Sequence, residues 1–152
     1  MSRYELWLFL HVAAAMVWIG GATAGQVFAA LAKRSGDPAR TAAFGRDIGF
    51  VGRYVFLPAS LVVFVTGALL TEEGGWPWSE PFVLFGVAAW AVVSALAFGY
   101  VLRELKVAGA TIAAEGPTPA LVARVNRLVL IARVLIVVLF VIVFAMVVKP
   151  GT

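Results

Sequence analysis

Four long apolar runs, separated by short polar stretches, dominate the pattern of this chain. They cover residues 6–32, 50–71, 81–102 and 128–148. A helix rises ~1.5 Å per residue, so about 20 apolar residues cross the ~30 Å hydrocarbon core of a bilayer. Short connectors make successive helices antiparallel neighbours. The pattern therefore predicts an all-α membrane protein, with residues 1–152 forming one antiparallel bundle of four transmembrane helices.

Proline and aspartate indicate where these helices begin and bend. Asp37 followed by Pro38 is typical of a helix start, and we expect a short interfacial helix there that runs into the second span. Pro58 removes one backbone hydrogen bond and predicts a kink at or just before it. The third helix is expected to end near Leu102 and the fourth to begin near Pro119.

The composition agrees with lipid as the surrounding solvent. Hydrophobic residues make up 62% of the chain and charged residues 13%, about half the charged share of an ordinary soluble domain. The absence of cysteine excludes disulfides and thiolate metal sites. The net charge of +4 comes from cations beside the apolar runs, which favours a lipid bilayer rather than nucleic acid as the partner.

Cation placement predicts the orientation. Only Arg3 and Lys149 lie at the end of the bundle that holds both termini. Most other cations lie in or beside the first and third connectors: Lys33, Arg34, Arg40, Arg46, Arg103, Lys106, Arg124 and Arg127. The positive-inside rule then places both basic connectors in the cytoplasm and both termini outside. We expect a multi-pass protein of the bacterial inner (plasma) membrane.

His11 is the only histidine of the chain and lies inside the first apolar run. It is eight residues after Arg3, roughly 12 Å into the membrane. An ionisable group at that depth is costly and is a functional-site hypothesis by default. One reading is an axial haem ligand, because neutral imidazole suits iron and copper. The other is a hydrogen bond to a serine, threonine or carbonyl of a neighbouring helix. For a metal ligand, we expect the second ring nitrogen to bond to a small polar group such as Ser60 or Thr66 in the second span.

Further candidates surround this hypothesis. Trp18 shares the helix face of His11 and either packs in the core or stacks beside a flat cofactor. Met146 is a possible second ligand to haem or Cu(I). Arg53 and Arg133 lie near the inner headgroup boundary, where they either reach lipid phosphates or pair with the propionates of a cofactor.

Gly21 and Gly25 form a G-x-x-x-G pattern in the first span. Such a pair lets another helix approach closely, either inside the bundle or in a homo-oligomer or larger membrane complex. The sequence contains no nucleophile triad, phosphate-binding loop or pair of carboxylates within a span. No catalytic residue is therefore assigned, and a non-catalytic role is favoured.

Short motifs resemble those of a membrane-protein superfamily. His11 followed by Trp18-Ile19-Gly20-Gly21 resembles the first-helix H-x(6)-W-x-G pattern of HemJ-type protoporphyrinogen oxidases and CopD-like copper-resistance domains. Leu57-Pro58-Ala59-Ser60-Leu61 with Thr66-Gly67 is similar to their second-helix P-x(7)-T/F-G segment. Val147-Val148-Lys149-Pro150 resembles the V-V-K-P close of HemJ proteins. A bacterial family of four-helix membrane proteins of unknown function, in the same superfamily, is nearest.

This resemblance implies that His11 binds haem and that Trp18 and Lys149 belong to the same cofactor-binding site. Departures from the HemJ pattern at Gln26-Val27-Phe28 and Ala132-Arg133-Val134 disfavour porphyrinogen oxidation. We therefore expect a protein that binds a small cofactor, with haem b the leading candidate, between the first, second and fourth spans. The alternatives are an accessory subunit or homodimer without a cofactor, HemJ-like oxidoreductase activity, and CopD-like copper handling.

Overall fold

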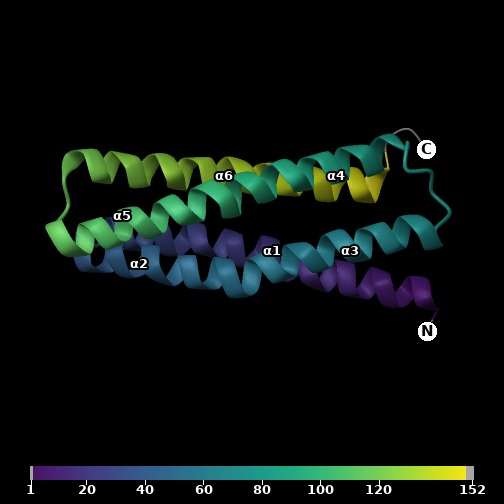
Figure 1. Cartoon of the computed structure of the whole chain (residues 1–152), viewed down its shortest axis with the longest axis horizontal. Helices are drawn as coiled ribbons and strands as arrows, with labels where there is room; N and C mark the ends of the chain where they lie inside the picture. Colours follow the sequence, from purple (N-terminus) through teal and green to yellow (C-terminus); the bar gives the residue numbers. More distant parts are fainter. Residues whose placement is uncertain (1, 150–152) are drawn as a thin grey trace.

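A computed structural model describes residues 2–149, nearly all of which are helical. Figure 1 shows long antiparallel rods, and residues 2–149 contain no strand. The elements in chain order are α1 (Arg3–Arg34), α2 (Pro38–Val51), the π-helical segment η1 (Gly52–Phe56), α3 (Leu57–Glu73), α4 (Pro81–Ser94), the π-helical segment η2 (Ala95–Val101), α5 (Leu102–Glu115) and α6 (Pro119–Val148).

Four apolar helices long enough to cross a membrane result, because α2 continues through η1 into α3 and α4 continues through η2 into α5. The four helices contain 32, 36, 35 and 30 residues. Only 6–22% of their most apolar stretches is buried within the chain. Such a large exposed apolar surface is stable in lipid and not in water. The predicted four-helix membrane bundle is confirmed.

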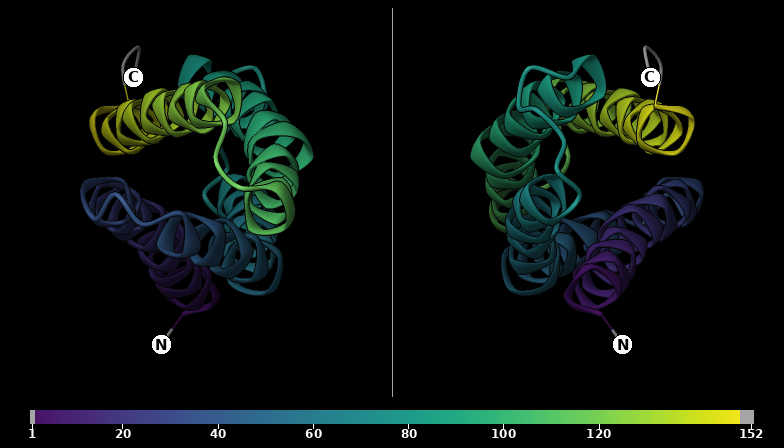
Figure 2. Two further views of the ribbon diagram at one scale, coloured as in Figure 1. Left: turned by 90° about the vertical axis from the view of Figure 1, so that its left-hand side faces the viewer. Right: turned by 90° about the vertical axis from the view of Figure 1, so that its right-hand side faces the viewer.

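The two ends of the bundle differ in their connections. Both termini and the turn between α3 and α4 lie at one end, here called the terminal end (Figure 1). The connectors at residues 35–37 and 116–118 lie at the other, here called the basic end. Viewed along the bundle, the helices surround a common axis (Figure 2). The arrangement has the antiparallel order expected from the short connectors.

The predicted helix starts are formed as the capping rules require. The Asp37 side chain accepts a hydrogen bond from the backbone N–H of Ala39 at 2.9 Å, and Pro38 occupies the first turn of α2. At the basic end of α6, Thr118 is the N-cap and Pro119 follows it. Each cap satisfies a backbone donor that has no partner inside its helix. The helix start expected at Asp37-Pro38 is confirmed, and the helix that begins there continues into the second span.

The third long helix does not end near Leu102, which corrects the sequence-based boundary. Arg103 and Lys106, expected in a connector, lie in α5, and the helix ends only at Gly116, with φ at +83°. The reason is packing. α5 buries Leu105, Ala108, Gly109 and Ile112 at helical spacing, and this face packs along α2. Amphipathic packing stabilises a helix beyond its apolar span.

The proline in the second long helix is accommodated by a π-helical turn. Pro58 lacks a backbone N–H, and its ring crowds the carbonyl four residues earlier. η1 ends two residues before it, and the N–H of Leu57 bonds to the carbonyl of Gly52, five residues back. Where a kink was expected at or just before Pro58, the structure has a widened turn within a continuous helix.

Candidate functional site

One face of α1 points into the bundle, as its small residues predicted. Trp18 is only 4% exposed, whereas Met16, on the opposite face, is 70% exposed. The residues of the inner face are buried or half-buried: His11, Ala15, Trp18, Ala22 and Gly25. This face brings His11 against α3, at the part of the bundle nearer the terminal end.

The His11 ring is hydrogen-bonded to Thr66 of α3. Its Nδ1 lies 3.1 Å from the hydroxyl oxygen of Thr66, which is 3% exposed. That hydroxyl donates its own proton to the carbonyl of Val62 at 2.5 Å. A hydroxyl has only one proton to give, so Nδ1 is the donor to Thr66. The hydrogen bond expected between His11 and the second span is confirmed, with Thr66 as its partner.

This bond determines which ring nitrogen carries the proton. In a neutral imidazole with its proton on Nδ1, Nε2 keeps its lone pair. Gly67 lets the ring approach α3, because a Cβ at that position would come within 3.1 Å of the His11 Cε1. Residues 2–149 hold no group of three His, Cys, Asp or Glu side chains suited to a metal ion. With the proton on Nδ1, Nε2 is the ring nitrogen with the lone pair that coordination requires.

Trp18 and Lys149 each have aromatic neighbours. The Trp18 ring stacks on Phe98 of η2, with ring centres 6.0 Å apart. Lys149 ends α6 with φ at +48°, and its Nζ lies 4.5 Å from the Trp76 ring centre and 5.8 Å from that of Phe82. Lys149 therefore ties the end of α6 to the α3–α4 turn. Pro150, the last residue of the V-V-K-P motif, lies outside the described residues.

The remaining predicted site residues contact other parts of the bundle. The Met146 methyl group fills the space beside Gly86 of α4. Arg53 is exposed on η1, with its guanidinium carbon 5.9 Å from the centre of the Tyr54 ring. Arg133 is exposed on α6, towards the basic end. Met146 and Arg53 thus contact partners other than His11.

The two glycines of the G-x-x-x-G pattern face the chain itself. A Cβ at Gly21 would collide with the ring of Phe56, and one at Gly25 would lie 3.2 Å from the Ile48 side chain. Both neighbours belong to the second long helix. Of the two contacts that the pattern allowed, the structure contains the one inside the bundle.

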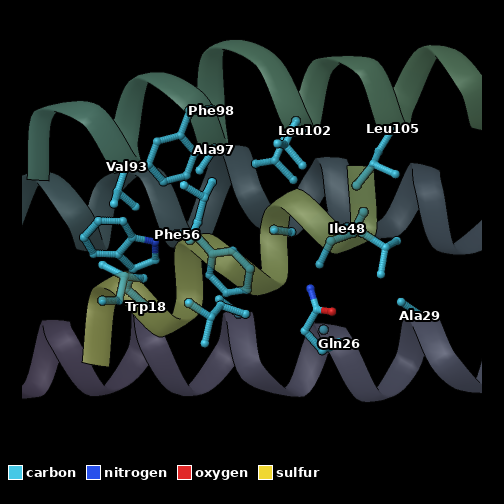
Figure 3. Close-up of a pocket in the computed structure, with 18 of the residues that line it drawn as sticks. Trp18, Gln26, Ala29, Ile48, Phe56, Val93, Ala97, Phe98, Leu102 and Leu105 are labelled. Atoms are coloured by element: carbon cyan, nitrogen blue, oxygen red, sulfur yellow. The ribbon is translucent and has the colours of Figure 1, made fainter. Parts of the chain in front are cut away.

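Two hollows were not expected from the sequence. The first, here called the central cavity, has a volume of about 80 Å³ and lies between α1, η1, η2 and α6 (Figure 3). Its walls include Trp18, Phe56 and Phe98. The second, here called the basic-end cleft, has a volume of about 520 Å³ and is lined by Lys33 and Arg133, among others. His11 lines neither hollow.

Among residues 2–149, Gln26 is the one polar side chain that lines the central cavity, and it stands out in the sequence because it interrupts an apolar run. Figure 3 shows its carboxamide directed into the space between the helices. Its Oε1 is buried without a hydrogen-bond partner, as are Trp7 Nε1 and Ser94 Oγ. Buried polar atoms are normally satisfied. A single glutamine within a membrane span is therefore a signal for a functional site, just as the single histidine is.

The comparisons with known proteins give a family and no function. Residues 5–150 match the family model described as "Predicted integral membrane protein (DUF2269)". No curated protein and no solved structure matches the chain. The family match gives no support to the resemblance to HemJ and CopD-like proteins. The match covers nearly the whole bundle, and the chain therefore belongs to the DUF2269 family of predicted integral membrane proteins.

Proposed function

We propose that this chain is a non-catalytic protein of the bacterial inner membrane that binds a small cofactor, haem b, through Nε2 of His11. The observation that supports the proposal is the His11–Thr66 hydrogen bond. It orients the ring and keeps the proton on Nδ1, as partners of metal-bound histidines commonly do. Haem iron is held in many proteins by such a histidine.

The other residues limit how a haem would be held. The central cavity, at about 80 Å³, is smaller than the ~150 Å³ cavity that binds benzene. A porphyrin does not fit there, so the proposal places it against the half-exposed side of His11. Met146 packs beside Gly86, which leaves the second axial position to a second copy of the chain or to an exogenous ligand. Bound haem would supply redox or gas-binding chemistry, and the chain would orient it.

Visible spectroscopy tests this proposal directly. The chain is purified in detergent from haem-replete cells, and haemin is added to any apoprotein. We expect a Soret band from the unmodified chain and none from His11→Gln, which keeps a polar side chain and should still insert. Met146→Leu is the matched control and should retain the band. A chain without a Soret band after haemin addition, or a His11→Gln variant with full haem content, would overturn the proposal.

A structural or accessory role is the second candidate. Its support is the same hydrogen bond, because His11 and Thr66 join α1 and α3, which pack together extensively. On this reading His11 contributes to stability alone. Cross-linking in native membranes, followed by mass determination of the purified chain, tests it. A second chain or a homodimer is expected, whereas a strictly monomeric chain without a partner would contradict this role.

A further inference from the structure

The central cavity and the basic-end cleft adjoin each other and are together called the hollow below. Ala29 of α1, Phe44 of α2 and Val129 of α6 line both of them. Contacts between α1 and α6, the first and last helices, are sparse beside those of α1 with α3 or α2 with α5. The hollow therefore runs from the basic end of the bundle towards its middle, between helices that are loosely joined.

The end of the hollow at the basic-end cleft is positively charged. Lys33 of α1 and Arg133 of α6 both line the cleft, and neither forms an ion pair within residues 2–149. The cleft also includes one carboxylate, Asp37, whose Oδ1 is engaged by the backbone of α2. Thr41 and Asn126 add neutral hydrogen-bonding groups. This set of side chains favours an anion, and its volume of about 520 Å³ lies within the ~300–1,000 Å³ range of ligand pockets.

The other end of the hollow is apolar and narrow. Apart from Gln26, its walls are hydrophobic side chains and glycine. Phe56 comes from η1 and Phe98 from η2, so both π-helical segments contribute to it. π-helical turns occur frequently at functional sites. A space of about 80 Å³ with such walls suits part of a flexible hydrocarbon chain rather than a ring system.

We propose that this hollow binds one anionic phospholipid of the leaflet at the basic end. Its phosphate group lies beside Lys33 in the basic-end cleft, with Arg133 deeper in the same cleft, and one acyl chain passes Ala29 into the central cavity. Lysine and arginine at the membrane surface attract anionic lipids, and basic pockets between helices bind their headgroups. The proposal does not depend on a cofactor at His11, which lines neither part of the hollow.

Gln26 has a place in this arrangement. It lies seven residues before Lys33 on α1, about 10 Å deeper along the helix. That is the region where the ester groups of a lipid follow its phosphate. A half-turn of the carboxamide exchanges its oxygen and nitrogen, and the N–H group then donates to an ester carbonyl. The lipid thereby supplies an acceptor for the N–H group at the buried position where Oε1 has no partner.

Fluorescence quenching in vesicles tests the proposal. The full chain is reconstituted into phosphatidylcholine vesicles with increasing amounts of phosphatidylglycerol that has brominated acyl chains. Bromine quenches indole emission at short range, so the Trp18 signal, taken as the difference from Trp18→Phe, reports a chain in the central cavity. We expect this quenching to saturate at a low fraction of the anionic lipid. Brominated phosphatidylcholine should quench only in proportion to its bulk fraction.

Charge variants and a blocking variant complete the test. The double variant Lys33→Ala/Arg133→Ala should raise the half-saturating lipid fraction by about tenfold or more, and the matched Arg34→Ala/Arg127→Ala should not. All four cations are exposed, so these variants should fold. Ala29→Phe should abolish saturable quenching, and Ala24→Phe, at an exposed position of the same helix, should preserve it.

Three results would overturn the proposal. The first is Trp18 quenching that follows the bulk bromine fraction for both lipids. The second is saturable quenching that the charge variants leave unchanged. The third is displacement of the brominated lipid by inorganic phosphate, which would assign the cleft to a soluble anion.

Discussion

Nδ1 of His11 donates a hydrogen bond to the hydroxyl of Thr66, whose own proton is directed to the carbonyl of Val62. The chain of bonds runs from α1 to the backbone of α3 and leaves the ring lone pair of the only histidine on Nε2. A hydrogen bond between membrane helices contributes on average about 0.6 kcal/mol and at most about 2. The larger consequence of the His11–Thr66 bond is that it holds the imidazole in one tautomer, with the lone pair on Nε2.

Replacement of Thr66 tests that assignment. Thr66→Val preserves shape but removes the acceptor, so the Nδ1–H of His11 would be buried without its partner. We expect a loss of about 0.6–2 kcal/mol in stability, measured by thermal unfolding in detergent. The ¹⁵N resonances of the imidazole should show a protonated Nδ1 in the unmodified chain and a mixed tautomer in the variant. Thr66→Ser keeps the hydroxyl and should match the unmodified chain, and a protonated Nε2 there would contradict the assignment.

The close approach of α2 and α5 gives a second prediction. A Cβ at Gly45 would lie 2.9 Å from the carbonyl oxygen of Leu105 and 3.3 Å from Cα of Gly109. Because those atoms are backbone, Gly45→Ala must separate the helices, at a cost of about 1–3 kcal/mol. Gly49→Ala is the control: its Cβ would be at least 3.7 Å from Lys106, and alanine favours a helix by about 1 kcal/mol. Gly45→Ala should unfold below the unmodified chain and Gly49→Ala at or above it.

Lys149 should stabilise the terminal end through its aromatic neighbours. Its Nζ lies over the rings of Trp76 and Phe82, and a cation–π contact contributes about 0.5–2 kcal/mol. Lys149→Leu removes the charge and should lower the unfolding temperature, whereas Lys149→Arg should retain most of the stability. Equal unfolding temperatures for the two variants would show that the charge at this position is not stabilising.

The membrane orientation can be tested independently of any ligand. The cation bias predicts that the basic end is cytoplasmic and that both termini are outside. A reporter active only in the cytoplasm should therefore be active when inserted at Gly36 or Gly116, in the two basic-end connectors. Fused after Lys149, the same reporter should be silent. The reverse pattern of activities would mean that the chain is inserted the other way round.

Much of the architecture follows from the sequence alone. The apolar runs predicted four membrane helices, and the short connectors predicted their antiparallel order. Asp37 caps α2 as its sequence indicated, and α6 begins at Pro119, where the fourth helix was expected to begin. Even the partner of His11 was among two expected hydroxyls, because residues at similar depth on adjacent helices are few. These features depend on local periodicity, capping and depth in the membrane, which can be predicted from each segment of the sequence without the others.

Only the tertiary structure decided which side chains meet. Met146 and His11, both possible ligands, contact different helices, and α5 extends past its apolar run because it packs on α2. The hollow between Lys33 and Trp18 has walls from all four long helices. Its shape depends on how the helices rotate, shift along each other and widen at η1 and η2. Those quantities are set by the joint packing of distant segments, so no single stretch of the sequence contains them.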